Sequence, residues 1–197
     1  PTSRNIIFIT PGSACGIQII TNCYDEIIKY RSEARRALDI PKNEKVVIYV
    51  GRPIKRKGFF DLLDAWDRFH NCTNYFLLLV GPSETDKARL KKIPASNIRF
   101  MGYQIDPTNF YLAADVLCIP SHHEGLGYCY IEASAVGCVP ICSNIVGPTD
   151  FVKNRINGIT CNPGDSKSIC DSITEVLSDD KLREDLALNA FSHALSY

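Results

Sequence analysis

Hydrophobic and polar positions between residues 45 and 197 come in blocks that predict strands and helices in turn. Short apolar runs such as Val46–Val50 and Tyr75–Val80 are typical of strands that are buried on both faces. Residues 59–69 instead carry apolar side chains at helical spacing. The predicted strands are 46–50, 75–80, 98–101, 116–119, 139–142 and 159–161. The predicted helices are 59–69, 84–92, 108–113, 128–136, 166–177 and 181–195.

Strands that alternate with helices in this way predict an α/β fold. We expect a Rossmann-like, doubly wound parallel sheet with helices on both faces, formed by residues 45–197. Residues 1–44 differ, because a short apolar piece (6–9) and a loop (11–16) precede a charged helix at about 25–38. We expect 1–44 to be a lead-in arm that packs on the following domain.

Two glutamates eight positions apart, Glu124 and Glu132, lie in a segment that joins an apolar strand to a helix. Ligands bind outside the carboxyl ends of the strands in open α/β sheets, and Glu124 follows such an end. Gly125 and Gly127 let a ligand approach the backbone and leave amide groups free to donate. With Glu132 about one and a half turns into the helix, the two carboxylates lie at most about 12 Å apart.

This spacing favours two hydroxyl-bearing parts of one ligand over two carboxylates that share a proton. The alternative is that acidic residues in the first turns of a helix only complement its dipole.

A basic loop follows the first strand of the domain, with the sequence Gly51-Arg52-Pro53-Ile54-Lys55-Arg56-Lys57-Gly58. It gathers cationic side chains beside the start of a helix, which suits a phosphate or diphosphate. Arg52 can bind such a group bidentately, whereas Lys57 acts as a mobile point charge. The alternative is a solvated basic loop without a ligand.

Other chemical signatures are absent or weak. The chain has no G-x4-G-K-[ST] loop, no G-x-G-x-x-G after the first strand, no D-x-D triplet and no G-x-S-x-G elbow. The run His122-His123-Glu124 suggests a metal, but adjacent loop residues rarely converge on one ion, so we expect no metal. Residues 144–150 add polar groups at the same sheet edge, or Asp150 caps the following segment.

Composition narrows the class of protein. Lys plus Arg equals Asp plus Glu at 22 each, so net charge gives no argument for nucleic acid or a membrane surface as a partner. No apolar run approaches the length of a membrane span. Nine cysteines occur without a C-x2-C pair, which favours reduced thiols and a cytoplasmic protein.

With these motifs in order, residues 45–190 resemble the C-terminal, donor-binding half of a family 4 (group 1) retaining glycosyltransferase of the GT-B fold. The resemblance rests on the basic loop, on Gly102-Tyr103, on the E-x7-E run and on Ala133-x-Ala135-x-Gly137-x-x-Pro140. Asn157-Gly158 and Asn162-Pro163-Gly164-Asp165 complete the set. Leu126 stands where phenylalanine is frequent in the family, and Gly147-Pro148-Thr149-Asp150 replaces Gly-Gly-x-x-Glu.

The resemblance implies a role for each residue. Arg52 and Lys57 hold the diphosphate of a nucleotide-sugar donor, and with Glu124, which faces the donor sugar, they form the catalytic group. Glu132 binds the ribose hydroxyls, and the backbone at Tyr103 lies near the base. Three consecutive backbone amides contact sugar or phosphate: Gly125, Leu126 and Gly127.

The resemblance also implies what lies outside this chain. A sugar or lipid-linked sugar acceptor binds mainly to an N-terminal domain that the sequence lacks, so we expect a segment of a protein about twice as long. In the complete protein the enzyme is cytoplasmic, either free or peripheral to the membrane. Two alternatives remain, a GT-B-fold nucleotide-sugar epimerase and a non-catalytic nucleotide-binding module.

Overall fold

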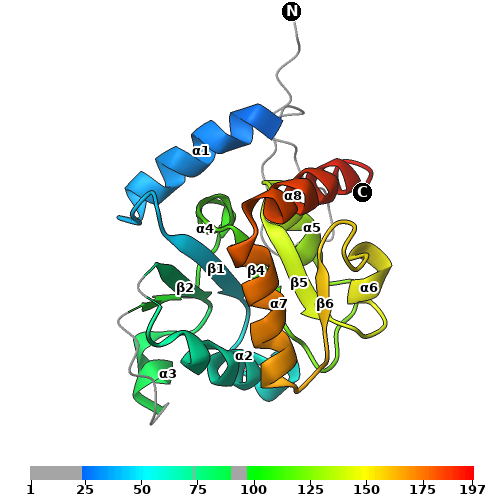
Figure 1. Cartoon of the computed structure of the whole chain (residues 1–197). Coiled ribbons are helices and arrows are strands. Elements are labelled where there is room, and N and C mark those ends of the chain that lie inside the picture. The colour runs from blue at the N-terminus through cyan, green and yellow to red at the C-terminus, as the bar shows by residue number, and fades with distance from the viewer. Residues whose placement is uncertain (1–23, 73, 90–96) are drawn as a thin grey trace, which may run out of the picture.

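The computed structural model describes residues 24–72, 74–89 and 97–197. In this part of the chain six parallel strands form one sheet with the order β3-β2-β1-β4-β5-β6 (Figure 1). The strands are β1 Lys45–Val50, β2 Tyr75–Val80, β3 Ile98–Gly102, β4 Val116–Ile119, β5 Val139–Ser143 and β6 Ile159–Cys161. The helices are α1 Tyr24–Ala37, α2 Phe59–Trp66, α3 Glu84–Arg89, α4 Thr108–Ala113, α5 Tyr128–Ser134, α6 Pro148–Phe151, α7 Ser166–Ser178 and α8 Asp180–Ala194.

The strand order reverses between β1 and β4. The chain runs from β1 outward to β3, then crosses back to β4 beside β1 and proceeds outward to β6. Val47 of β1 pairs with Val116 of β4, while all of β1 pairs in register with β2. A reversal of this kind leaves a crevice at the carboxyl ends of the two central strands. The predicted doubly wound parallel sheet is confirmed.

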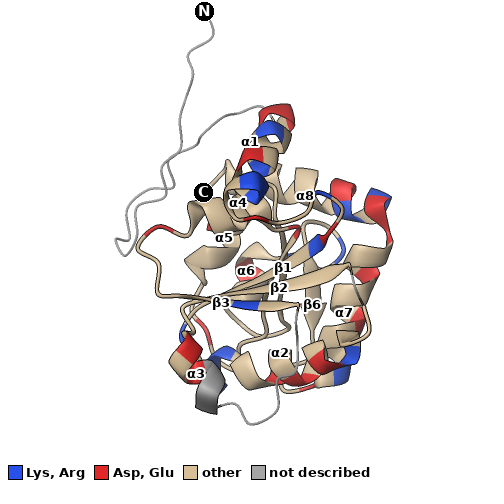
Figure 2. Ribbon diagram, turned by 90° about the vertical axis from the view of Figure 1, so that its left-hand side faces the viewer, with Lys and Arg blue, Asp and Glu red and all other residues tan. Residues whose placement is uncertain are grey.

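Helices cover both faces of the sheet. Seen with the sheet nearly edge-on, α4 and α5 lie on one side of the strands and α2 on the other (Figure 2). On the second side α2 packs against α7, and on the first α5 packs against α8. Every side chain of β4 is fully buried, as expected for a central strand between two helical layers.

A buried cluster of charged residues, Arg31, Arg35 and Asp115, links α1 to the amino-terminal ends of the strands. The Asp115 carboxylate accepts hydrogen bonds from Arg35 Nη2 at 2.7 Å, Arg31 Nη1 at 3.2 Å and the Val46 backbone N–H at 2.7 Å. Arg35 also donates to the backbone carbonyls of Ala113, Lys42 and Glu44. The predicted helix before Pro41 therefore packs on the domain, whereas the predicted features at 6–9 and 11–16 lie outside the described residues.

The element boundaries differ from the prediction at a few points. Helix α5 ends at Ser134, and the chain then turns into Gly137, which is left-handed at φ 74°. The last turn of the predicted helix 59–69 is a 3-10 turn, Asp67–Phe69. Beyond Arg89, the predicted helix 84–92 lies outside the described residues.

Helix α6 was not predicted. It has four residues and begins with Pro148 after Gly147, whose φ is 100°. Asp150 lies inside this helix, so the expectation that it caps the following segment is wrong. In the part of the chain that the structure describes, no helix combines the length and apolarity that a membrane span requires.

Candidate active site

The two loops at the strand-order reversal lie directly against each other. The loop after β4 is tied to the loop after β1 by the His122 backbone N–H, which donates to the Arg56 carbonyl at 2.8 Å. Gly58 is left-handed at φ 66°, and a Cβ there would lie 1.9 Å from the Pro120 carbonyl oxygen. Only glycine permits this approach, so the sequence at Gly58 allows the basic loop to pack beside the glutamate loop.

Lys57 and Glu124 meet across these loops. Lys57 Nζ donates to Glu124 Oε2, and the two side chains are only 19% and 13% exposed. The other carboxylate oxygen, Oε1, accepts from the Gly125 backbone N–H at 3.2 Å. Ser121 Oγ lies 3.5 Å from Oε2. The structure thus brings together the cation and the carboxylate that the sequence placed at one sheet edge.

Arg52 has a fixed backbone and an exposed side chain. Its carbonyl accepts a 2.7 Å hydrogen bond from the Tyr49 hydroxyl, which lies in the core at the end of β1. Burial raises the pKa of Tyr49 well above its usual value, so this hydroxyl stays protonated and donating. Among the described residues we find no hydrogen bond or ion pair of the Arg52 guanidinium. An anionic ligand can therefore bind it without displacing a described side chain.

Glu132 lies in α5, half-buried against α4. Its Oε2 accepts a hydrogen bond from the Tyr111 hydroxyl at 3.1 Å. Burial raises the pKa of the Glu132 carboxyl, with a smaller contribution from Asp106, while the Tyr111 hydrogen bond opposes the shift. Burial of a carboxylate is unfavourable unless its oxygens accept hydrogen bonds. Hydroxyl groups of a ligand could donate such hydrogen bonds to Glu132.

Cys129 lies in electrostatic reach of both glutamates, and the sequence analysis did not single it out. Burial raises the pKa of its thiol to about 12, Lys57 lowers it, and Glu132 and Glu124 raise it further. The thiol is therefore neutral at physiological pH. A cysteine in the first turn of a helix carries no sequence signal for such surroundings.

The glycine turn before α5 is open on one side and crowded on the other. A Cβ on Gly125 would meet nothing within 4 Å, so a ligand can approach this exposed backbone. Gly127 has φ 72°, and a Cβ there would lie 2.5 Å from the Tyr130 ring. A Cβ on Gly147 would lie 2.3 Å from the Gly125 carbonyl, which places the predicted segment 144–150 at the same edge. Leu126 packs partly on the core.

Tyr103 follows β3, two strands away from the reversal on the β1 side. Its side chain is 79% exposed. The loops after β2 and β3 are joined by the Gly81 backbone N–H, which donates to the Gly102 carbonyl at 2.7 Å. The predicted position of Tyr103 near a base stays a prediction.

The two histidines after β4, His122 and His123, have different surroundings. His122 Nε2 lies 2.6 Å from Asp61 Oδ2, and His123 is exposed. In the described ranges no three His, Cys, Asp or Glu side chains are arranged to hold a metal ion.

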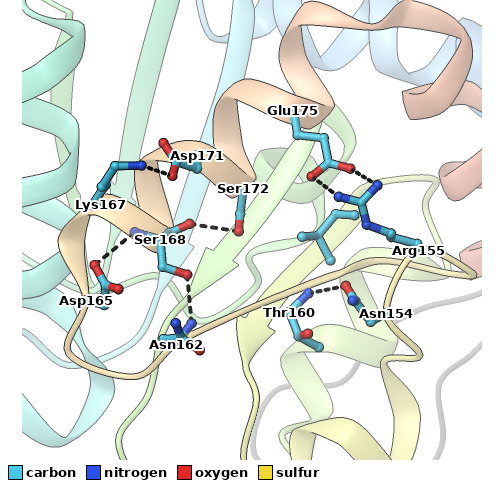
Figure 3. A pocket seen from close by; sticks show the side chains of 11 residues that line it. Asn154, Arg155, Thr160, Asn162, Asp165, Lys167, Ser168, Asp171, Ser172 and Glu175 are labelled. Atoms are coloured by element: carbon cyan, nitrogen blue, oxygen red, sulfur yellow. Dashed lines mark hydrogen bonds and ion pairs between the residues drawn. The ribbon is translucent and has the colours of Figure 1, made fainter.

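A separate polar cavity of about 310 Å³ lies between β6 and α7 (Figure 3). Four of its charged side chains pair with each other, Arg155 with Glu175 and Lys167 with Asp171, and Asp165 accepts from the Ser168 backbone N–H at 3.0 Å. The Asn162 backbone N–H donates to Ser168 Oγ at 2.9 Å, and both residues line the cavity. These groups satisfy one another, so the sheet edge where the β1 and β4 loops meet is the stronger candidate.

Known proteins resemble this chain in sequence and in fold. A family model described as "Glycosyl transferases group 1" matches residues 30–193. The lipopolysaccharide core biosynthesis glycosyltransferase LpsE of Rhizobium meliloti is 32% identical over 158 residues, which are 78% of this chain and 45% of that protein. The capsular polysaccharide biosynthesis glycosyltransferase CapM of Staphylococcus aureus is 32% identical over 154 residues, 75% of this chain and 40% of that protein.

Solved structures agree on the fold. Sucrose-phosphate synthase from Thermosynechococcus elongatus superposes with a TM-score of 0.75 at 27% identity, over 86% of this chain and 46% of that chain. The C-terminal domain of the group 1 protein LpcC from Francisella tularensis superposes with a TM-score of 0.74 at 23% identity, over 84% of this chain and 91% of that domain. Anabaena HepE, solved with UDP and glucose, gives 0.72 at 22% identity, over 90% of this chain and 51% of that chain.

This chain spans less than half the length of these two curated relatives, yet the family model covers most of it. Its six-stranded parallel sheet with helices on both faces is consistent with one half of the GT-B fold, as the sequence predicted. The chain belongs to the group 1 glycosyltransferase family.

Proposed function

We propose that this chain is the donor-binding domain of a retaining glycosyltransferase. The complete enzyme transfers a sugar from a nucleotide-diphosphate sugar to an acceptor hydroxyl in polysaccharide or glycolipid synthesis. The observation that carries the proposal is the meeting of Lys57 and Glu124 at the strand-order reversal, beside the exposed Arg52. The names of LpsE and CapM, and the UDP and glucose bound to HepE, support the same class of reaction.

The cationic residues bind and stabilise the diphosphate. Arg52 reaches the phosphate oxygens through paired N–H donors, while Lys57 supplies a mobile ammonium. Negative charge grows on the diphosphate as the glycosidic bond breaks, so these cations stabilise the transition state more than the bound donor. No metal is required in this scheme, because Arg52, Lys57 and backbone amides meet the charge.

The two glutamates bind the sugar and the ribose at opposite ends of the donor. Glu124 accepts from hydroxyls of the donor sugar, and Glu132 accepts from the ribose hydroxyls. The backbone at Tyr103 lies near the base. Amides of the turn before α5 contact sugar or phosphate, namely Gly125, Leu126 and Gly127.

The acceptor, a sugar or lipid-linked sugar, binds mainly to a part of the protein outside this chain. The isolated chain then binds nucleotide weakly and does not transfer sugar, because acceptor positioning is missing. Free thiols at seven described cysteines support a reducing, cytoplasmic setting.

Product analysis with the complete protein tests this function. We expect release of nucleoside diphosphate that depends on a saccharide acceptor, and an anomeric configuration in the product equal to that of the donor, measured by NMR. Lys57→Ala should lower the transfer rate by about 100-fold or more, the usual effect of removing one group that stabilises transition-state charge. Lys55→Ala, which removes an exposed cation from the same loop, serves as the control. An isomerised nucleotide-sugar formed without acceptor contradicts the proposal and indicates an epimerase. Binding without any turnover indicates a non-catalytic module.

A further inference from the structure

Asp61 and His122 form a second side-chain link between the segments that Lys57 and Glu124 join. Asp61 lies in the first turn of α2, four residues after Lys57, and His122 lies two residues before Glu124. Asp61 Oδ2 is 2.6 Å from His122 Nε2, which indicates that Nε2 carries the proton it donates. Both side chains are mostly buried, 22% and 26% exposed.

The rest of His122 is also held. Its backbone N–H donates to the Arg56 carbonyl at 2.8 Å. Its ring lies against Gly164 in the loop between β6 and α7, where a Cβ would come within 3.2 Å of His122 Cε1. Gly164 is left-handed at φ 73°. His122 is therefore held by three segments of the chain, namely α2, the loop after β1 and the loop between β6 and α7.

Glu124 itself has fewer constraints. Apart from Lys57, its carboxylate is contacted only by the adjacent Gly125 N–H and at 3.5 Å by Ser121 Oγ, among the described residues. When a diphosphate attracts Lys57, the ion pair with Glu124 weakens. The carboxylate then keeps its place only if the loop that carries it is fixed by something else.

We propose that Asp61 and His122 are positioning residues that hold the Glu124 loop while Lys57 is engaged by the donor diphosphate. This inference rests on the proposed donor-binding function and adds two residues to it. Carboxylate placement within about 0.5 Å separates productive from unproductive contacts at such sites. A second link that does not involve Lys57 supplies this placement.

The proposal separates two parts of donor binding. Arg52 and Lys57 belong to the loop after β1, whose backbone has its own hydrogen bonds. The Arg52 carbonyl accepts from the Tyr49 hydroxyl, and the Lys57 N–H donates to the Ile54 carbonyl at 3.0 Å. Removing the Asp61–His122 link should therefore leave nucleoside diphosphate affinity nearly unchanged. It should weaken the additional affinity that the sugar provides through Glu124, and it should lower kcat.

The test compares a nucleoside diphosphate with its nucleotide-sugar in the complete protein, by calorimetry. The ligand pairs are UDP with UDP-glucose, GDP with GDP-mannose and ADP with ADP-glucose, and the pair that the wild type binds most tightly is used. For Asp61→Ala and for His122→Ala we expect a change of less than about threefold for the diphosphate and about tenfold weaker binding of the nucleotide-sugar. The double variant should lose no more than either single variant, because both break one interaction.

Two neighbouring residues provide matched controls. Asp64→Ala lies on the same helix and His123→Ala in the same loop, and both positions are exposed. Asp61→Asn keeps the shape and a hydrogen-bond acceptor for His122, so it should recover most of the lost affinity and should fold even where alanine variants do not. Equal weakening of both ligands, or no difference from Asp64→Ala and His123→Ala, overturns the positioning role. A wild type that binds none of the three pairs overturns the donor-site function, and the positioning proposal with it.

Discussion

Lys57 and Glu124 are bound to each other at the point where a donor diphosphate would need Lys57. If this site binds a diphosphate as proposed, the diphosphate must compete with a carboxylate for the same ammonium. Because both side chains are mostly buried, solvent screens this competition only in part. On the proposed function, we therefore expect the ion pair to lower the affinity for a diphosphate.

Glu124→Gln separates these effects. Removal of the carboxylate charge frees Lys57, so we expect nucleoside diphosphate to bind about three- to tenfold more tightly, which is about 0.7–1.4 kcal/mol. Sugar transfer should fall by about 100-fold, because the contact to the donor sugar is weakened. Calorimetry with the diphosphate and a steady-state transfer assay measure the two quantities. A weaker diphosphate affinity in this variant would show that Glu124 helps, and does not oppose, diphosphate binding.

Glu132→Gln should stabilise the unliganded protein at neutral pH. Burial raises the pKa of Glu132, so the folded state favours the protonated carboxyl. The stabilising contribution of the protonated form is complete below the usual glutamate pKa of about 4.5 and is lost as pH rises through the raised value. Glutamine remains uncharged and can still accept from Tyr111.

Urea unfolding of wild type and Glu132→Gln between pH 4 and pH 8 measures this difference. The advantage of the variant in free energy of unfolding should grow with pH across the range. If Glu132 binds the ribose hydroxyls as proposed, nucleotide affinity should fall in the same variant, because an amide is a weaker acceptor than a carboxylate. A variant that is less stable than wild type at pH 8 contradicts the assignment of burial as the cause.

Asp115→Ala should destabilise the domain strongly. The substitution leaves Arg35 and Arg31 without their carboxylate partner at the edge of the sheet, so we expect the free energy of unfolding to fall by about 3–5 kcal/mol. Asp180→Ala is a contrasting control. Hydrogen bonds from Lys45 and Arg183 lower the pKa of Asp180 to about 2, yet its side chain is 69% exposed, so we expect a loss below about 1 kcal/mol. Chemical denaturation compares the two, and similar losses would count against a structural role for the buried cluster.

Gly58→Ala and Gly125→Ala should affect different properties. At Gly58 a Cβ meets the Pro120 carbonyl at 1.9 Å and φ is positive, so we expect a loss of about 2–4 kcal/mol in unfolding free energy. At Gly125 a Cβ meets nothing within 4 Å, so stability should change by less than about 0.5 kcal/mol. The methyl group still intrudes on the ligand side, and nucleotide-sugar affinity should fall. Unchanged affinity in Gly125→Ala would place the ligand elsewhere.

The sequence predicted the sheet well because its strands are buried on both faces. Residues 116–119 and 75–80 are continuous apolar runs, and the structure begins and ends β4 and β2 at those residues. The α/β alternation also placed Lys57 and Glu124 at one sheet edge, since parallel strands end together. Helix α6 escaped prediction because it has only four residues and its start depends on the packing of Gly147 against Gly125.

Contacts between segments that are distant along the chain could not be predicted from the sequence. The Asp61–His122 link joins α2 to the loop after β4, 61 positions apart, and neither residue carries a pattern that points to the other. The same holds for Tyr111 and Glu132, which meet because α4 and α5 pack together. Local spacing reveals which side chains reach a sheet edge, whereas their partners depend on helix packing.

Titration of the protein with a nucleoside diphosphate tests the central claim most directly. Isothermal calorimetry with UDP, GDP and ADP, each beside its monophosphate, should find one diphosphate that binds more tightly than its monophosphate. Arg52→Ala and Lys57→Ala should each weaken that binding by about tenfold or more, consistent with loss of a charge-assisted contact, while Lys55→Ala leaves it unchanged. If no diphosphate binds, or if Arg52→Ala and Lys57→Ala bind as the wild type does, the sheet edge at the β1 and β4 loops is not a donor site.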